Sequence, residues 1–324
     1  RLGYARTLLT LQLSAEAVGQ LMQLNAKHPD FADGWLIHGL VLQENGQLPE
    51  AEKRLEKYVD LIANSKTPEH QAGLAEALMA LAQIAQKNGQ LERANQWLAR
   101  MPAGADPIKL ASRQADLLAQ QGRMDEARRV LAQIKPANAE QARRKVLTQS
   151  FWLREHREAQ AAYTLVKAAL DNKPDDTELL SELALICEKL KRVDEMEALL
   201  RQLMAKAPQD AHAFNALGYS LADRNIRLDE AQQLIEKAVQ LSPQDAYIQD
   251  SLGWVIFRQG KHKEALAILQ AAYKSRPDAE IAAHLGEVLW TTGQTREAGT
   301  IWREGLLLKA DNETLVETLK RFNF

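Results

Sequence analysis

The histidines are the side chains of this sequence best suited to metal binding, and they are scattered along the chain. None of the seven histidines belongs to a His-Glu-x-x-His motif. His284 and Glu287 are one helical turn apart and could contact the same ion. Two ligands are too few for a typical zinc site. We therefore interpret this pair as solvated groove residues, and we expect no metal and no other cofactor.

Residues that could carry catalysis do not occur in the patterns that catalysis uses. The sequence has no glycine-rich phosphate loop and no G-x-S-x-G motif. Cys187 is the only cysteine, which excludes an intrachain disulfide framework and a multi-cysteine zinc site. It ends the apolar run 183–187, so we interpret it as a buried packing residue and not as a reactive thiol. These observations predict a protein that is not an enzyme.

The charge balance limits the possible partners. Lys and Arg number 41 against 43 Asp and Glu, which gives a net charge of −2. Such a chain lacks the basic surface that nucleic acids require, so we expect no nucleic-acid partner. No apolar run is long enough to span a membrane. Because the chain begins with Arg1, we expect either a processed form or a shortened piece of the protein, with any signal peptide or lipid-attachment cysteine upstream.

The helices that must position these residues are marked by prolines. Spacings of 34 or 35 residues separate successive members of two series: Pro68, Pro102 and Pro136, and Pro174, Pro208, Pro243 and Pro277. Proline is tolerated at helix edges, where its missing N–H costs nothing, and is unfavourable in helix interiors. The spacing therefore predicts a helical repeat.

Small residues recur at fixed places in each repeat. When each unit is numbered from its first helix, position 8 is always small: Gly39, Ala82, Ala115, Ser150, Ala184, Gly218, Gly253 and Gly286. Position 20 is alanine in seven of eight units, Met196 being the exception. Small side chains at both places let two helices approach closely. Glycine at the intervening turn suits a left-handed helix end, and the turn glycines are Gly46, Gly89, Gly122, Gly260 and Gly293.

This pattern resembles the tetratricopeptide repeat family. The clearest copies combine 214–218 with Ala231, Ala238 and Pro243, and 252–253 with Gly260, Ala265, Ala272 and Pro277. The resemblance implies an all-α fold, a right-handed superhelical solenoid of about nine hairpins. Each hairpin would bury its apolar face against the next one.

The repeat sets the expected domain boundaries. Tandem units are expected over 1–312, as a partial unit 1–31 and then 32–65, 75–106, 108–142, 143–176, 177–210, 211–245, 246–278 and 279–312, followed by a capping helix at 313–324. We expect irregular joints at 66–74 and 136–142. The unit 177–210 matches least well, with Lys191 at the turn, so we expect a bend or looser packing there. The unit 211–245 has one extra residue near 223–226, which should lengthen its turn.

In the family, five positions of each first helix face a concave groove. Carried over to this sequence, the pattern puts aromatic and polar side chains together in the last three units, a composition typical of protein-binding hot spots. We predict a partner-binding groove formed by Asn215, Tyr219, Tyr247, Asp250, Trp254, Phe257, Arg258, Glu287 and Trp290. Trp254→Ala or Trp290→Ala should then weaken partner binding without unfolding the chain. The alternative is that some of these aromatic residues pack against neighbouring helices.

Residues 211–310 are similar to a group of bacterial tetratricopeptide lipoproteins on the periplasmic side of the outer membrane. The similarity is carried by 215–226, 250–255 and 282–290. The best-understood members bind a PDZ-containing carboxyl-terminal processing protease and present substrates such as cell-wall hydrolases to it. The resemblance implies a lipid-anchored adaptor whose partners are proteins or peptides, with membrane contact only through an upstream anchor. The lysine-containing clamp of the family's chaperone-binding members is not reproduced.

Two alternatives remain open at this point. One is an assembly factor for an envelope machine, similar to a pilotin. The other is the tetratricopeptide segment of a larger enzyme, as in certain glycosyltransferases. A signal peptide ending in a lipobox cysteine would support the scaffold, whereas a long C-terminal catalytic region would support the enzyme.

Overall fold

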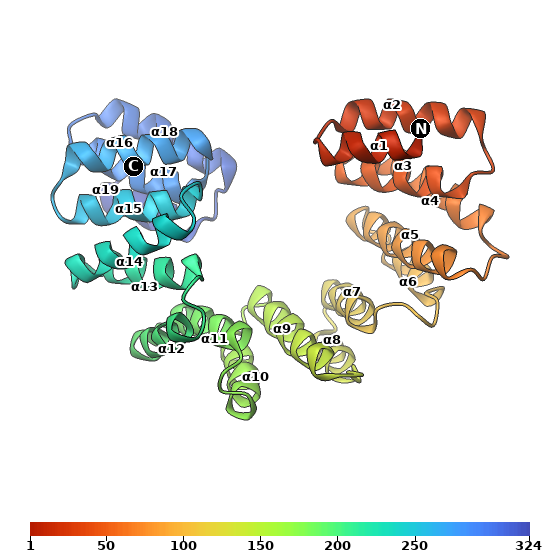
Figure 1. The fold of residues 1–324 in the computed structure, drawn as a ribbon, viewed down its shortest axis with the longest axis horizontal. Helices are drawn as coiled ribbons and strands as arrows, with labels where there is room; N and C mark the ends of the chain where they lie inside the picture. The colour runs from red at the N-terminus through yellow and green to blue at the C-terminus, as the bar shows by residue number, and fades with distance from the viewer. The chain divides into compact units, whose positions relative to one another are not determined.

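The computed structural model describes residues 1–324, and its regular structure consists only of α-helices. The helices are α1 (Leu2–Thr10), α2 (Ser14–Lys27), α3 (Ala32–Glu44), α4 (Leu48–Leu61), α5 (Pro68–Lys87), α6 (Leu91–Ala99), α7 (Pro107–Gln120), α8 (Met124–Ala132), α9 (Ala139–Glu155), α10 (Ala159–Asn172), α11 (Thr177–Lys189), α12 (Val193–Lys206), α13 (Ala211–Asp223), α14 (Leu228–Leu241), α15 (Ala246–Arg258), α16 (His262–Ser275), α17 (Ala279–Thr291), α18 (Thr295–Leu308) and α19 (Glu313–Phe322). They follow one another as helix–turn–helix pairs, with α19 after the last pair (Figure 1). The predicted all-α class is confirmed. No helix is both long and apolar enough to cross a bilayer.

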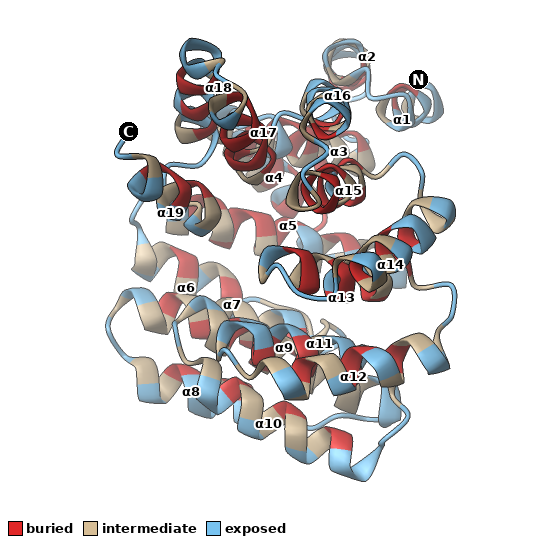
Figure 2. Cartoon of the chain, turned by 90° about the vertical axis from the view of Figure 1, so that its left-hand side faces the viewer, coloured by how far each residue is buried: buried red, intermediate tan, exposed pale blue.

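The chain divides into two compact units. Unit 1 comprises Arg1–Trp152 and unit 2 comprises Leu153–Phe324. Within each unit, the buried residues lie on the helix sides that face a neighbouring helix (Figure 2). Helix α17 is buried almost throughout, because it packs against α15, α16, α18 and α19. Each unit therefore has a core that continues from one hairpin into the next.

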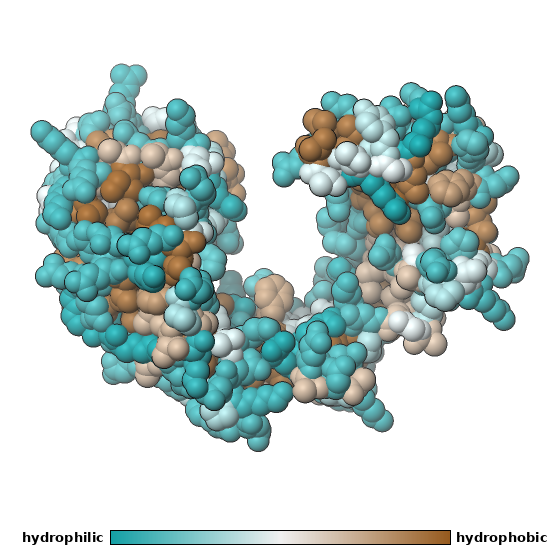
Figure 3. All heavy atoms as spheres, viewed as in Figure 1, coloured by the Kyte–Doolittle hydropathy of each residue, from teal (hydrophilic) through white to brown (hydrophobic).

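The surface of each unit is mostly hydrophilic. On the face that Figure 3 shows, hydrophilic side chains cover most of both units, and apolar residues appear between them in smaller patches. Charged residues make up 26% of the chain, and basic and acidic residues are nearly balanced in number. The apolar side chains are thus used mainly between the helices, as a stacked repeat requires.

Close helix approach explains the small residues of the repeat. The alanines at position 20 are all completely buried: Ala51, Ala94, Ala127, Ala162, Ala231, Ala265 and Ala298. A Cβ atom added to Gly218 would lie 2.6 Å from Ile235 Cγ1 and 2.9 Å from the carbonyl oxygen of Ala231. A larger side chain would therefore force the two helices of this hairpin apart.

Aspartate fixes the start of several first helices. The Asp210 carboxylate accepts hydrogen bonds from the backbone N–H groups of His212 and Ala213. Asp245 caps α15 in the same way, and Asp106 caps α7. These carboxylates satisfy N–H groups that have no partner inside the helix, and they interact favourably with the helix dipole.

One expected joint is wrong. We expected 66–74 to be irregular, but α5 begins at Pro68 and runs for 20 residues. Thr67 caps this helix by accepting a hydrogen bond from the His70 N–H, and Pro68 occupies the first turn. Proline at the start of a helix has the required φ and loses no hydrogen bond, so Pro68 begins a long helix. Helix α9 likewise begins at Ala139, inside the joint expected at 136–142.

Every turn within a helix pair contains a residue with positive φ. Five of these residues are the predicted glycines, whose φ values run from 73° to 86°. The remaining turns use Gln12, Arg157, Lys191 and Asn225, with φ between 55° and 62°. Arg227 also has a positive φ, in the turn where the extra residue was predicted. The turn geometry is therefore kept even where glycine is missing.

We predict that Lys191→Gly stabilises unit 2 by about 0.5–1 kcal/mol. The left-handed conformation costs a non-glycine residue about 1–2 kcal/mol, and glycine's greater loss of entropy offsets only part of that gain. Urea denaturation followed by circular dichroism measures the change. Lys191→Ala is the control, because it removes the charge and keeps the Cβ atom. Equal stability of the two variants would contradict the prediction.

Candidate functional site

The inner helices of unit 2 bury a tryptophan–histidine stack. Trp254 on α15 is 2% exposed, and its ring lies 4.3 Å from the ring of His284 on α17, centroid to centroid, with an interplanar angle of 23°. Phe257 lies 5.3 Å from Trp254 on the next turn of α15. Trp254 is thus part of the core and not an open groove side chain. This burial corrects the expectation that Trp254→Ala leaves the fold intact.

His284 joins three inner helices through hydrogen bonds. Its Nδ1 lies 2.8 Å from the Asp250 carboxylate on α15, and its Nε2 lies 3.3 Å from the Tyr219 hydroxyl on α13. His284 is 1% exposed and Asp250 is 3% exposed. The interpretation of His284 as a solvated residue is therefore wrong. No local pattern in the chain indicates this pairing, because Asp250 and His284 belong to different repeats.

The electrostatics of this cluster favour a charged imidazole. Burial by itself disfavours the imidazolium, but the carboxylates of Asp250, Glu280 and Asp223 outweigh it and raise the pKa of His284 above its usual value. Burial also raises the pKa of Tyr219 well above its usual value, which keeps its hydroxyl protonated.

Glu287 is also buried, and its partner comes from the end of the chain. It is 5% exposed, and its two carboxylate oxygens accept hydrogen bonds from Arg321 on α19 at 3.1 and 2.5 Å. The carboxylate and His284 therefore have different partners, although they are one turn apart. The expectation of a solvated His284–Glu287 pair is wrong for both residues.

Trp290 belongs to an aromatic cluster at the C-terminal end of unit 2. Its ring lies 5.4 Å from Trp302, 5.8 Å from Phe322 and 6.5 Å from Phe324. Aromatic pairs of this geometry stabilise a fold beyond the area that they bury. The structure thus gives Trp290 a packing role in this cluster.

The other predicted groove residues lie at different depths. Tyr247 is 38% exposed and its hydroxyl donates to Asp278 at 3.2 Å. The Arg258 guanidinium lies 5.5 Å above the Trp254 ring, and Asn215 is half-buried. The structure brings Tyr219, Asp250, Trp254, Phe257 and Arg258 together around His284, and it places Tyr247 at the edge of this cluster. Binding of a partner by this set stays a prediction.

A polar pocket of about 290 Å³ lies over this cluster. One side is formed by Tyr219, Trp254, Arg258 and His284, and the other side by α19. We expected a capping helix at 313–324, but the sequence did not indicate that it would face the groove residues. The inner surface of unit 2 is therefore partly covered by the chain itself.

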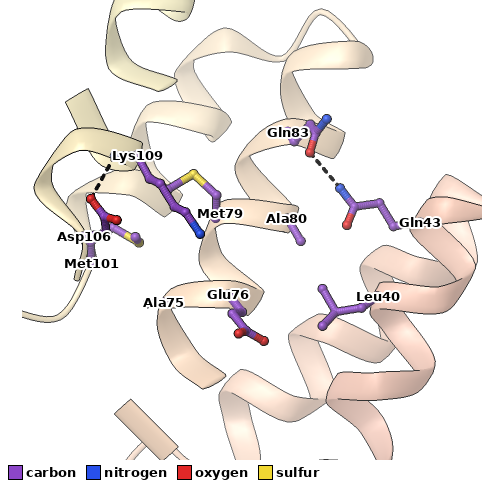
Figure 4. Close-up of a pocket in the computed structure, with 10 residues that line it drawn as sticks. All are labelled: Leu40, Gln43, Ala75, Glu76, Met79, Ala80, Gln83, Met101, Asp106 and Lys109. Atoms are coloured by element: carbon purple, nitrogen blue, oxygen red, sulfur yellow. Dashed lines mark hydrogen bonds between the residues drawn. The ribbon is translucent and has the colours of Figure 1, made fainter. Parts of the chain in front are cut away.

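Unit 1 has a more open and more apolar hollow, which sequence reasoning missed (Figure 4). Its volume is about 320 Å³, and it is lined by Leu40, Gln43, Ala75, Glu76, Met79, Ala80, Gln83, Met101, Asp106 and Lys109. Aliphatic side chains and methionines make up much of its wall, and the Gln43 amide donates to Gln83 at 3.0 Å. Several of these residues occupy the inner positions of their repeats. Leucine and methionine at such positions look like ordinary core residues in the sequence, whereas aromatic residues suggest a binding site.

The charged edge of this hollow contains one fixed ion pair. Asp106 Oδ2 lies 2.7 Å from the Arg144 guanidinium, while Oδ1 caps α7. Burial acts to raise the pKa of Asp106, but the hydrogen bonds from Arg144 and the backbone outweigh it and lower that pKa. Glu76 and Lys109 remain exposed beside the apolar wall. An apolar wall with charged groups at its edge can bind a peptide and fix its orientation.

The two units have the architecture of a helical-hairpin repeat protein. The pattern of the tetratricopeptide repeat family matches residues 66–319, which is more than half of the chain. This chain belongs to the tetratricopeptide repeat family. Such proteins generally act as non-catalytic scaffolds for protein–protein interaction.

A curated relative and two solved structures extend this comparison. TPR repeat-containing protein PA4667 of Pseudomonas aeruginosa is 35% identical over 207 residues, which cover 64% of this chain and 35% of that protein. The chain thus spans about a third of that relative's length. TTC0263, a thermophilic TPR protein of Thermus thermophilus, is 23% identical with a TM-score of 0.50, over 56% of this chain and 99% of the Thermus chain. A tetratricopeptide repeat protein from Parabacteroides merdae is 16% identical with a TM-score of 0.49, over 89% of this chain and 97% of that one. The likeness to the Thermus structure shows the fold alone.

We predict that the stability of unit 2 falls as pH rises above about 6.5. A folded-state pKa above the unfolded value means that His284 contributes its full stabilisation below the unfolded pKa and loses it as pH rises through the folded pKa. Urea denaturation between pH 5.5 and pH 9, at steps of about half a unit, measures this slope. His284→Gln is the control, because it keeps a donor for Asp250 and removes the titration. The prediction fails when both proteins show the same pH dependence.

Trp254→Ala should destabilise unit 2 by about 3–5 kcal/mol, because it leaves a large cavity beside His284. Tyr247→Ala is the matched control from the same predicted groove, and its exposed side chain should cost about 1 kcal/mol or less. Chemical denaturation of both variants gives the comparison. If both variants lose the same free energy of unfolding, burial does not explain the different roles assigned to these two aromatic residues.

Proposed function

We propose that this chain is a scaffold of the bacterial cell envelope that brings a carboxyl-terminal processing protease together with substrates such as cell-wall hydrolases. The full-length protein would be attached by a lipid to the periplasmic side of the outer membrane. Its ligands would be folded proteins and exposed peptide segments. The chain itself would perform no chemistry.

The observation that carries the binding role is the hollow of unit 1. It offers a methionine- and leucine-containing wall between three consecutive first helices, α3, α5 and α7. Methionine side chains adapt to differently shaped partners, which suits a scaffold with more than one ligand. Lys109 and Glu76 at its edge would favour one orientation of a charged segment.

The choice of partner is supported by the resemblance of residues 211–310 to envelope lipoproteins that bind such a protease. Two proteins held on one chain gain effective concentration, so modest affinities suffice for rapid proteolysis. The scaffold would thus act by proximity and would leave the protease chemistry unchanged.

We predict that the purified chain raises the rate at which a PDZ-containing carboxyl-terminal processing protease cleaves a cell-wall hydrolase, by about tenfold or more at submicromolar concentrations. Met79→Lys, which puts a charge into the wall of the hollow, should remove most of this gain. Gel densitometry of the remaining hydrolase measures the rate.

Met22→Lys is the matched control, because Met22 is 55% exposed on α2 and does not line the hollow. It should stimulate cleavage as well as the wild type does. No stimulation by the wild-type chain would overturn the adaptor role. Equal stimulation by Met79→Lys would remove the hollow of unit 1 from it.

A further inference from the structure

Helix α19 lies across the inner surface of unit 2 instead of only closing its end. Its first residue, Glu313, forms an ion pair of 3.0 Å with Lys189 at the end of α11, which is 124 residues earlier in the chain. Near its other end, Arg321 pairs with Glu287 on α17. Between these two contacts, Thr314, Glu317 and Thr318 face the pocket formed by α13, α15 and α17. The helix therefore spans the groove from the unit 177–210 to the unit 279–312.

Two kinds of contact hold α19 in this place. Leu315 and Leu319 are buried on its apolar side, and Phe322 packs 5.5 Å from Trp302, so α19 also covers the end of the core (Figure 2). The side that faces the groove is polar and leaves the pocket of about 290 Å³ beneath it. Across the pocket the contacts are ion pairs, whereas Leu315 and Leu319 belong to the same buried apolar cluster as Ala283 and Val288 of α17.

The ion pairs are the weaker part of this arrangement. The side chains of Lys189 and Glu313 are 51% and 80% exposed. Exposed pairs of this kind contribute little, and salt screens them. The Arg321 side chain is 52% exposed, while the Glu287 carboxylate is buried and needs a cation. A helix that supplied the same charges and the same pair of leucines could take the place of α19 in the groove.

The groove selects a definite charge pattern. Lys189 holds the pKa of Glu313 below its usual value, with a further contribution from Lys191. An acidic residue in the first turn of a helix also interacts favourably with the helix dipole, as does a basic residue in the last turn. The buried Glu287 carboxylate at the opposite end of the groove then requires the basic residue.

We propose that α19 is an internal occupant of a helix-binding groove on unit 2, and that this groove takes a partner helix with the pattern of α19. That helix has an acidic first turn, leucines four residues apart on one side and an arginine in its last turn, as Glu313, Leu315, Leu319 and Arg321 show. The partner displaces α19, so the groove is closed until such a helix arrives. This inference deepens the proposed scaffold function, on which it rests, by naming the kind of segment that unit 2 receives.

The experiment uses a fluorescein-labelled peptide of residues 309–324 and measures its fluorescence anisotropy with the full chain. In one chain variant, Glu313→Lys and Arg321→Glu together reverse both ion pairs of α19 and leave the groove residues unchanged. This variant should bind the wild-type peptide at least tenfold more tightly than the wild-type chain does. Glu313→Lys alone acts only at the exposed end and should give a gain of about two- to fivefold.

Lys320→Glu is the matched control, because it reverses a charge of α19 for which the structure shows no ion pair, and it should bind the peptide like the wild type. A scrambled peptide of the same composition should not bind. Hydrogen exchange of α17 tests whether each variant keeps its core. If the double variant loses its core, the peptide affinity of the single variant Glu313→Lys tests the proposal.

The proposal is overturned if the variants that keep their core bind the peptide no more tightly than Lys320→Glu does. It is equally overturned if the scrambled peptide binds as well as the α19 sequence. No protease or hydrolase is present in this assay, so its result is separate from that of the cleavage assay. If the chain does not stimulate the protease but its variants still bind the peptide, the adaptor role is rejected and the helix-binding groove of unit 2 is supported.

Discussion

The whole structure depends on how closely the two helices of each hairpin can approach. Ala231 faces Gly218 across one hairpin, where an added methyl group would meet both a side chain and the backbone. Such close approach packs large side chains such as Ile235 directly against the partner helix, and the remaining apolar side chains of each pair are buried against its neighbours. The stability of the stack therefore depends on the contacts between repeats as well as on those within them. The inner surface is formed by the side chains that take no part in these contacts.

The two units use their inner surfaces differently. In unit 1, Leu40 and Met79 remain partly exposed beside the hydrogen-bonded pair of Gln43 and Gln83, so a hollow stays open. In unit 2 the ring of Trp254 stacks on that of His284, and the imidazole of His284 is hydrogen-bonded to Asp250. The proposed binding in unit 1 would require no rearrangement, whereas the proposed binding in unit 2 would require the displacement of α19. The cost of that displacement would lower the apparent affinity for a partner and set a threshold for its binding.

Sequence analysis predicted those features that recur in every repeat. The proline spacing and the alanines at position 20 follow from local geometry, and therefore the helical class and the turns could be predicted. The extension of α5 to Pro68 was missed because proline marks a helix start as readily as a helix end. The candidate site was predicted less well. Trp254 and Tyr247 both lie on the inner helix α15, and only the structure shows that one is buried and the other exposed.

Contacts between distant repeats set the limit of such prediction. Lys189 and Glu313 look like two ordinary surface charges in the sequence, and nothing local relates them. Their pairing follows from the path of α19, which depends on the short connection at 309–312 and on the burial of Leu315 beneath it. Repeat patterns therefore predict the surface that each hairpin offers, but not whether the chain itself covers that surface. In this protein the self-covered groove is the one with the aromatic residues, and so the composition that suggested an open binding site belongs instead to a closed one.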